Sequence, residues 1–369
     1  MKKYLFILLI VAFSCNSEQE NFEVQIELEE YYIFELDSLT RRDSKHVGFV
    51  PSLNSIYLFN DNTYTLYFYN LATKENWKRI PFAKEGPEGL GRVDLFKVYS
   101  LDSIFSVNEI LGQITRISDE GKKIEKIRIL DMDNGDPAIQ SGISFFEFHK
   151  SKLFTLARQT PNVLPLRNKI LLEYDFDTKK KSYEIEWPIE YIEDWMMATK
   201  PSSAVMKDDK VYLSLPYNEH ILIYDLINGN LEKKYAGSSK IKKYVPYSGG
   251  GDMQSRIRHV LEGARYGKLV YEPTARVYLR EASVGLSIPI DANPLLATSE
   301  SGSFLSNNND NIYVLTIVLD ESLNKIGEVP HQKLYQDAFC ADSALFRRVV
   351  IYEKENEDIL VFGKYKVKY

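Results

Sequence analysis

The sequence has very little cysteine and histidine, and it has only one uninterrupted apolar run, close to its start. Its 369 residues include two cysteines, which excludes a disulfide-rich secreted scaffold. The five histidines show no HExxH spacing, and neither a Gly-x-Ser-x-Gly segment nor a GK[ST] phosphate loop is present. No Pro/Gly-rich stretch separates two domains. No catalytic class can therefore be read from a motif.

The charge balance also excludes one class of partner. The chain carries 46 basic and 52 acidic residues, a formal net charge of −6. Because nucleic-acid binding depends on a basic surface, this balance argues against nucleic acid as a partner. The 25 tyrosines and 19 phenylalanines favour strands over helices.

The N-terminus resembles a bacterial lipoprotein signal peptide. Met1-Lys2-Lys3 is basic, residues 4–13 are apolar, and Cys15 follows Ser14. The apolar run is shorter than the roughly 20 residues that a bilayer-spanning helix needs. We therefore predict a signal peptide over residues 1–14, lipidation of Cys15 and a tether over residues 15–24; an ordinary cleaved signal is the alternative. The protein is then expected in the cell envelope, at the outer membrane, with its leaflet left open.

The second cysteine, Cys340, has no disulfide partner if Cys15 carries lipid. We expect it to behave as a small, buried apolar residue rather than as a reactive thiol.

A loose unit repeats along the rest of the chain. A strand pattern ends in an Asp, Asn or Glu turn and continues into another strand, and the residues before these turns are 69, 117, 174, 224, 271 and 319. Spacings of 47 to 57 residues with three or four strands per unit are typical of propeller blades. An Asp or Asn at the turn is explained by its side chain capping the bend. The short helical patterns are Tyr191–Met197 and Met253–Leu261.

These repeats predict an all-β protein, a single β-propeller domain over residues 25–369. Six blades fit the spacing best, and seven is the alternative. The patterns at Leu345–Tyr352 and Ile359–Tyr365 form a last, shorter unit. We expect strands from Val24–Leu28 and Tyr32–Leu36 to pair with it, so that the two chain ends close the ring.

Two segments could bind a ligand. Asp131, Asp133 and Asp136 have some of the spacing of a calcium loop but lack its bidentate Glu, so a solvated turn is favoured and calcium is a weak alternative. No other cofactor is expected. A glycine-rich stretch ending at Asp252 precedes a basic cluster, in which guanidinium groups could bind an anionic or carboxylated ligand; a solvated, salt-bridged surface is the alternative. The cluster contains Arg256, Arg258, His259, Arg265, Arg276 and Arg280.

Three short motifs resemble those of the DUF4221 lipoproteins of Bacteroidota-type bacteria. They are Gly86-Pro87-Glu88-Gly89, the pair Tyr266–Pro273 and Val277–Arg280, and Val318–Glu321 with Gly327-Glu328. The resemblance implies a six-bladed propeller in an envelope lipoprotein. It transfers no catalytic residue, because the family has no assigned function.

Two functions are compatible with these features. The first is a non-catalytic binding or scaffolding module, anchored to the membrane through Cys15, that presents loops to a protein, peptide or glycan. The second is a hydrolase or lyase acting on glycans or lactones at an axial site, with or without the assistance of calcium. The absence of catalytic motifs favours the first.

Overall fold

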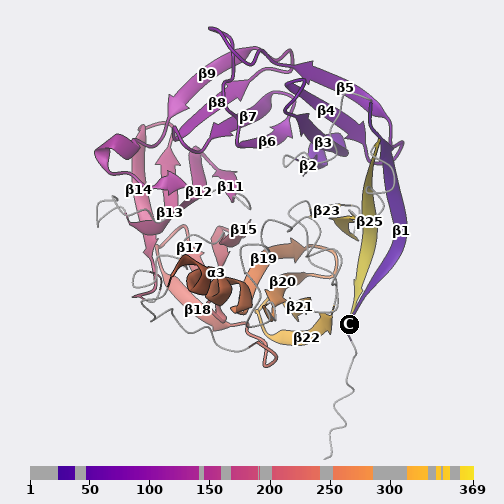
Figure 1. Ribbon diagram of the computed structural model, residues 1–369, viewed down its shortest axis with the longest axis vertical. Helices are drawn as coiled ribbons and strands as arrows, with labels where there is room; N and C mark the ends of the chain where they lie inside the picture. The colour runs from indigo at the N-terminus through magenta and orange to yellow at the C-terminus, as the bar shows by residue number, and fades with distance from the viewer. Residues whose placement is uncertain are drawn as a thin grey trace, which may run out of the picture.

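The structure is a computed structural model, and it describes residues 24–37, 47–140, 145–158, 168–189, 191, 202–241, 252–285, 314–330, 338–341, 344–349 and 358–369. Strands in these residues form six antiparallel sheets, which are arranged as a ring (Figure 1). The chain is therefore a six-bladed β-propeller, as the repeats predicted.

Each blade has four main strands in order from the ring centre to the rim, and the third sheet has a short fifth strand that pairs with its second strand. The inner strands are β2 (Val47–Val50), β6 (Leu95–Ser100), β11 (Phe146–His149), β15 (Ser203–Lys207), β19 (Arg265–Glu272) and β23 (Phe339–Ala341). The second strands are β3 (Ser55–Asn60), β7 (Ser103–Asn108), β12 (Lys152–Arg158), β16 (Lys210–Ser214), β20 (Val277–Ser283) and β24 (Ala344–Arg348).

The outer half of each blade is built in the same way. The third strands are β4 (Thr65–Asn70), β8 (Gln113–Ile117), β13 (Lys169–Asp175), β17 (His220–Asp225), β21 (Val314–Leu319) and β25 (Ile359–Lys368). The outermost strands are β5 (Asn76–Pro81), β9 (Lys123–Arg128), β14 (Lys180–Glu186), β18 (Leu231–Tyr235), β22 (Lys325–Pro330) and β1 (Gln25–Glu35). Three short helices, η1 (Pro51–Leu53), η2 (Met132–Asn134) and α3 (Met253–Glu262), and the short strand β10 (Ala138–Ile139) lie in links between these strands.

The two ends of the chain close the ring, as predicted. The N-terminal strand β1 pairs antiparallel with β25 along its whole length and forms the rim of the last blade. The sequence favours this pairing because β1 is rich in Glu and β25 is rich in Lys. Lys364 Nζ lies 3.5 Å from Glu29 and 3.7 Å from Glu30, and Lys368 Nζ lies 2.5 Å from Glu27. One continuous strand, rather than two short ones, makes the closure.

The repeat count contained one error. The units counted at residues 271 and 319 are the two halves of one blade, since β19, β20, β21 and β22 form a single sheet. The link from Ser283 to Val314 happens to make this blade about one repeat longer than the others. The unit at the chain ends supplies the sixth blade, so the total of six is unchanged.

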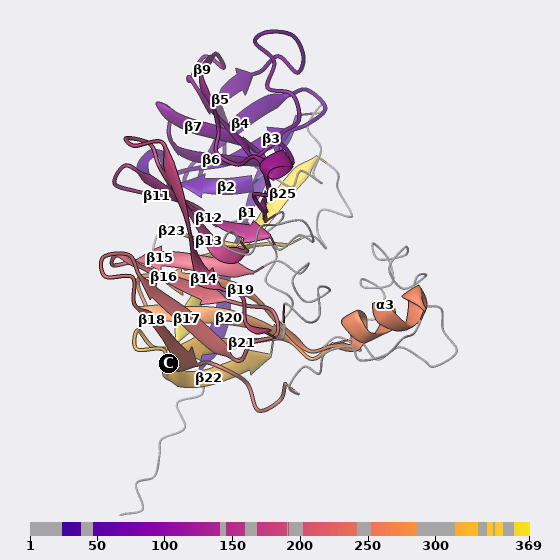
Figure 2. The same cartoon turned by 90° about the vertical axis from the view of Figure 1, so that its left-hand side faces the viewer.

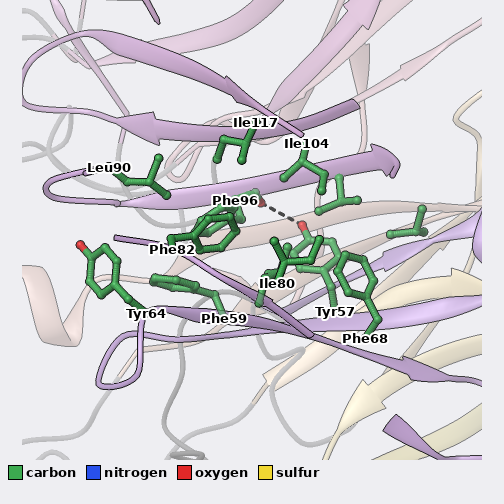
Figure 3. Close-up of a cluster of buried hydrophobic side chains, with 13 residues drawn as sticks. Tyr57, Phe59, Tyr64, Phe68, Ile80, Phe82, Leu90, Phe96, Ile104 and Ile117 are labelled. Atoms are coloured by element: carbon green, nitrogen blue, oxygen red, sulfur yellow. Dashed lines mark hydrogen bonds between the residues drawn. The ribbon is translucent and has the colours of Figure 1, made fainter. Parts of the chain in front are cut away.

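Aromatic side chains fill the space between neighbouring blades. Between the first two blades, Phe59 packs against Phe96 with ring centroids 4.5 Å apart, and Phe82 stacks on Phe96 at 5.5 Å (Figure 3). The Tyr57 hydroxyl donates a 2.8 Å hydrogen bond to the Phe96 carbonyl across this interface. Fully burying one such ring contributes about 1.5–3 kcal/mol, so these contacts hold adjacent blades together.

The tight turns are capped as predicted. The side-chain oxygen of Asn70 accepts from the backbone N–H groups of Ala72 and Thr73 at 2.9 and 3.0 Å. Asp175 accepts in the same way from the N–H groups of Asp177 and Thr178. Asp225 repeats the arrangement. These acidic and amide residues therefore serve the hairpins and need no catalytic explanation.

The meander gives the ring two different faces. We call the "turn face" the one that carries the tight turns 71–75, 118–122, 176–179, 208–209 and 226–230. The "connection face" is the opposite one, where the chain passes from blade to blade through longer links such as 82–94 and 236–264. Figure 2 shows α3 standing clear of the ring on one side. In the part of the chain described, no helix is long and apolar enough to cross a membrane.

Candidate functional site

Helix α3 forms where the sequence predicted a helix. Asp252 begins it, because its carboxylate accepts a 2.8 Å hydrogen bond from the Ser255 N–H. This backbone hydrogen bond lowers the pKa of Asp252. The helix ends at Gly263, whose N–H donates to the His259 carbonyl. The second predicted helix, Tyr191–Met197, lies outside the described residues apart from Tyr191.

Three members of the predicted basic cluster lie on this helix. Arg256, Arg258 and His259 are half-buried, and Arg258 forms an i,i+4 ion pair with Glu262 at 3.3 Å. Arg265 follows directly at the start of β19, where it pairs with Ser283. These four residues therefore share the connection face, within one link between blades.

The root of this insertion is tightly packed. Gly285 has φ +89°, and a Cβ there would collide with the backbone of Glu262. Only glycine therefore allows the chain leaving β20 to pass so close to the end of α3. The close approach places α3 beside the exit from β20.

Arg280 has a different environment from the rest of the cluster. It is fully buried on β20, and its guanidinium donates to Ser214 Oγ at 3.0 Å. It also donates to the carbonyls of Asn218, Glu219 and Ala236 at 2.6, 3.1 and 3.0 Å. Burial lowers the pKa of Arg280 to about 10, which still leaves it charged at neutral pH.

The aromatic face of Tyr266 completes this enclosure, 3.8 Å from the Arg280 guanidinium carbon. All the acceptors belong to the preceding blade or to the link that leaves it. Arg280 therefore joins the fourth and fifth blades beneath the α3 insertion, and it offers no exposed surface to a ligand.

Arg276 lies on the other side of the ring from α3. It is in the turn between β19 and β20, where it pairs with Glu321. Glu321 also accepts from Tyr271 at 2.8 Å and from Lys207 at 3.1 Å, and these hydrogen bonds lower its pKa to about 2. This network links the fourth and fifth blades on the turn face. Sequence proximity had grouped six basic residues that the structure divides among three locations.

The acidic loop lies in the link after β9. The carboxylate of Asp136 accepts from the Asp131 N–H at 2.7 Å, from the Tyr183 hydroxyl at 2.8 Å and from Lys181 Nζ. Burial opposes ionisation of Asp136, but these three donors outweigh it and lower its pKa.

The other two aspartates of this loop have different surroundings. Asp131 pairs with Arg128 at 3.0 Å, and Asp133 is exposed. Asp136 therefore ties the loop to β14. Among the described residues, no group of three or more His, Cys, Asp or Glu side chains is placed to hold a metal ion.

Of the two cysteines, only Cys340 lies in the described residues; Cys15, the predicted signal peptide and most of the predicted tether lie outside them. Cys340 is half-buried on β23 and has no disulfide. Burial raises the pKa of the Cys340 thiol to about 12, so it is protonated at neutral pH.

One residue that sequence reasoning missed is Arg347. Arg280 and Arg347 are both the fourth residue of a second strand, counted from the turn that follows the inner strand. Arg347 is 6% exposed and lies 5.0 Å from the ring of Tyr365, but its Nε and Nη2 find no acceptor among the described residues. The repeated position in neighbouring blades was the signal that could have found it.

Comparison with known proteins places the chain in a family. The profile described as "Domain of unknown function (DUF4221)" matches residues 23–330. The chain belongs to this family. A DUF4221 member from Bacteroides vulgatus has a solved structure that matches 95% of this chain and 99% of its own, with a TM-score of 0.75 and 19% identity.

A second solved structure supports the same fold. It is a protein of Bacteroides fragilis described as exported, with a TM-score of 0.57 and 11% identity, covering 93% of this chain and 96% of its own. At these identities the likeness to both structures shows the propeller fold alone. No curated protein matches this DUF4221 chain.

Proposed function

We propose that this DUF4221 propeller is a non-catalytic binding module of the cell envelope, anchored through lipid at Cys15. Its connection face, built around α3, would bind an anionic partner. The observation that carries the proposal is that the chain enters the ring on the face opposite to α3.

The position of the first strand supports this orientation. β1 begins at Gln25 beside Lys368, next to the C-terminus. The Tyr369 hydroxyl donates to the Ala275 carbonyl, in the turn between β19 and β20, so the start of β1 and the C-terminus lie on the turn face. A tether over residues 15–24 spans at most about 36 Å when fully extended. Lipid at Cys15 would thus keep the turn face towards the membrane and α3 away from it.

The charges on α3 support an anionic partner. Arg256, Arg258, His259 and Arg265 lie within ten residues of a chain whose net charge is −6. Guanidinium groups bind carboxylates and phosphates in a planar, bidentate manner, which makes a short basic segment selective for such groups. The description of a structural neighbour as exported agrees with a place in the envelope.

Site-specific photo-crosslinking in native envelopes tests the proposal. A photoreactive residue would replace Gln254, which is exposed on α3, and in a control it would replace Ile227, which is 74% exposed in a turn-face hairpin. We expect a discrete adduct from position 254 alone, and its loss in the R256E/R258E variant. Equal labelling from both positions, or labelling indifferent to the charge reversal, would contradict the proposal. Turnover of envelope glycans by the purified protein would instead favour the hydrolase alternative.

A further inference from the structure

A groove of about 440 Å³ lies at the rim between the third and fourth blades. It is bounded by β14 on one side and by β17 and β18 on the other, which lie next to each other in Figures 1 and 2. This volume is within the range of about 300–1,000 Å³ that is typical of ligand pockets. Its polar and aromatic lining includes Glu184, Glu186, Trp187, Tyr224 and Lys233.

The indole of Trp187 is the most informative part of the lining. Trp187 is 4% exposed and packs in the core shared by the two blades, with its ring 5.7 Å from that of Tyr191. Its Nε1–H finds no acceptor among the described residues. Because a buried indole N–H usually has a hydrogen-bond partner, an acceptor from a bound molecule would satisfy it.

The strand that carries the two carboxylates is strained at this point. Ile185, between Glu184 and Glu186, has φ +61°, a conformation that a β-branched residue rarely adopts. Such strain persists where the surrounding structure enforces it, and it is concentrated at ligand sites. Here it occurs in the wall of the groove.

The opposite wall is left open by a glycine. Gly229 has φ +73° in the turn capped by Asp225, and the nearest atom to a Cβ built there would be the Tyr224 hydroxyl oxygen, at 3.7 Å. Burial and the neighbouring Glu184 carboxylate raise the pKa of Tyr224 to about 12, so this hydroxyl keeps its proton. The Tyr224 hydroxyl already hydrogen-bonds to Glu184, so the donors that the groove offers a ligand are the Trp187 N–H and the Lys233 ammonium, beside the exposed Glu186 carboxylate.

We propose that this groove binds a short neutral saccharide. Sugar hydroxyls can donate to Glu184 and Glu186 and accept from Lys233, while an acetamide or hydroxyl oxygen can accept from the Trp187 N–H. The apolar lining, which includes Leu222 and Leu231, suits the C–H faces of sugar rings. This inference goes beyond the proposed function, because it adds a neutral ligand and a surface separate from α3.

A ligand-observed NMR titration of the intact protein tests the saccharide site. The probes are cellobiose, maltose and N,N′-diacetylchitobiose, with the tripeptide Lys-Ala-Lys as a cationic competitor. We expect at least one disaccharide to bind with a Kd on the order of millimolar, because an open groove removes only part of the ligand from water. W187F keeps an aromatic ring in the core but removes the N–H, and E186Q changes an exposed carboxylate; each should weaken binding about fivefold or more.

A matched control separates the groove from the rest of the ring. W77F changes a tryptophan that is 44% exposed on β5 of the first blade, and it should leave the Kd unchanged. The inference is overturned if no disaccharide binds up to about 20 mM, if E186Q binds as well as the wild type, or if only the tripeptide binds. Loss of saccharide binding in W187F and E186Q with cross-linking at position 254 intact would separate this site from the α3 face. Saccharide binding that W187F and E186Q weaken, together with no adduct from position 254 in the wild type, would leave this inference standing and refute the proposed function.

Discussion

Two buried arginines at equivalent positions should respond in opposite ways to replacement by methionine. Arg280 donates to four acceptors, whereas Arg347 has two nitrogens without an acceptor in the described residues. Methionine has a similar length and is apolar, so both substitutions remove the charge while keeping most of the packing. We predict that R280M destabilises the protein and that R347M does not.

The magnitude follows from the acceptors left behind. In R280M the Glu219 carbonyl keeps the Ala236 N–H as a donor, but the carbonyls of Asn218 and Ala236 lose the guanidinium. An unsatisfied buried acceptor costs about 1–3 kcal/mol, and the lost contact with Tyr266 adds to this. Removing the desolvation penalty of the buried cation offsets part of the loss. We expect a net destabilisation of about 2–4 kcal/mol.

For Arg347 the balance of terms is different. Burial lowers the pKa of Arg347 to about 10, which reflects the cost of holding its charge away from water. Few hydrogen bonds are lost on substitution, so R347M should unfold within about 1 kcal/mol of the wild type or be slightly more stable.

Urea unfolding followed by circular dichroism measures both variants. With an m-value of about 4 kcal/mol/M for a domain of this size, R280M should lower the midpoint by about 0.5–1 M. R258M, on the helix that stands clear of the ring, serves as the control: it removes one i,i+4 ion pair with Glu262 and should change the midpoint by much less than R280M does. If R347M is as destabilising as R280M, or if R280M is neutral, the argument from hydrogen-bond satisfaction is refuted.

Three further predictions concern charge, thiol chemistry and anchoring. Because the pKa of Glu321 is lowered to about 2, the contribution of this carboxylate to stability is complete above the ordinary pKa of 4.5 and is lost as the pH falls through 2. E321Q should therefore show a smaller fall in Tm from pH 5 to pH 3 than the wild type. An identical fall in the two proteins would contradict this prediction. Cys340 should react with a maleimide at pH 8 only after denaturation, since its thiol pKa is about 12, and rapid native labelling would oppose this. C15A should move the protein from the membrane fraction to the soluble fraction with its circular dichroism spectrum unchanged, whereas retention in membranes would argue against a lipid anchor.

The sequence predicted the blades well because each hairpin is encoded locally. The capping residues Asn70, Asp175 and Asp225 each follow a strand of β-favouring residues, so each turn can be predicted from the sequence of its own repeat. The fifth blade was misread because the long link between Ser283 and Val314 mimics a repeat. Periodicity alone cannot distinguish an insertion from an additional unit of similar length.

The basic cluster failed as a single site for a related reason. Arg276 and Arg280 are four residues apart, but one lies in a turn and the other inside a blade interface. Proximity along a strand says nothing about which blade a side chain faces, because the partners of Arg276 and Arg280 lie 44 to 66 residues away in the sequence. Trp187 and the rim groove were not found for the same reason, as their walls belong to two blades.

The sequence by itself determined the fold class and the closure by the chain ends, since these depend on local strand and turn chemistry and on the Glu-rich and Lys-rich terminal strands. It favoured six blades but left seven as the alternative. Only the tertiary structure decided which charges are buried, which face carries α3 and where the groove lies. These properties arise between blades, where side chains distant in sequence meet, and the free energy of each depends on partners that no local pattern specifies.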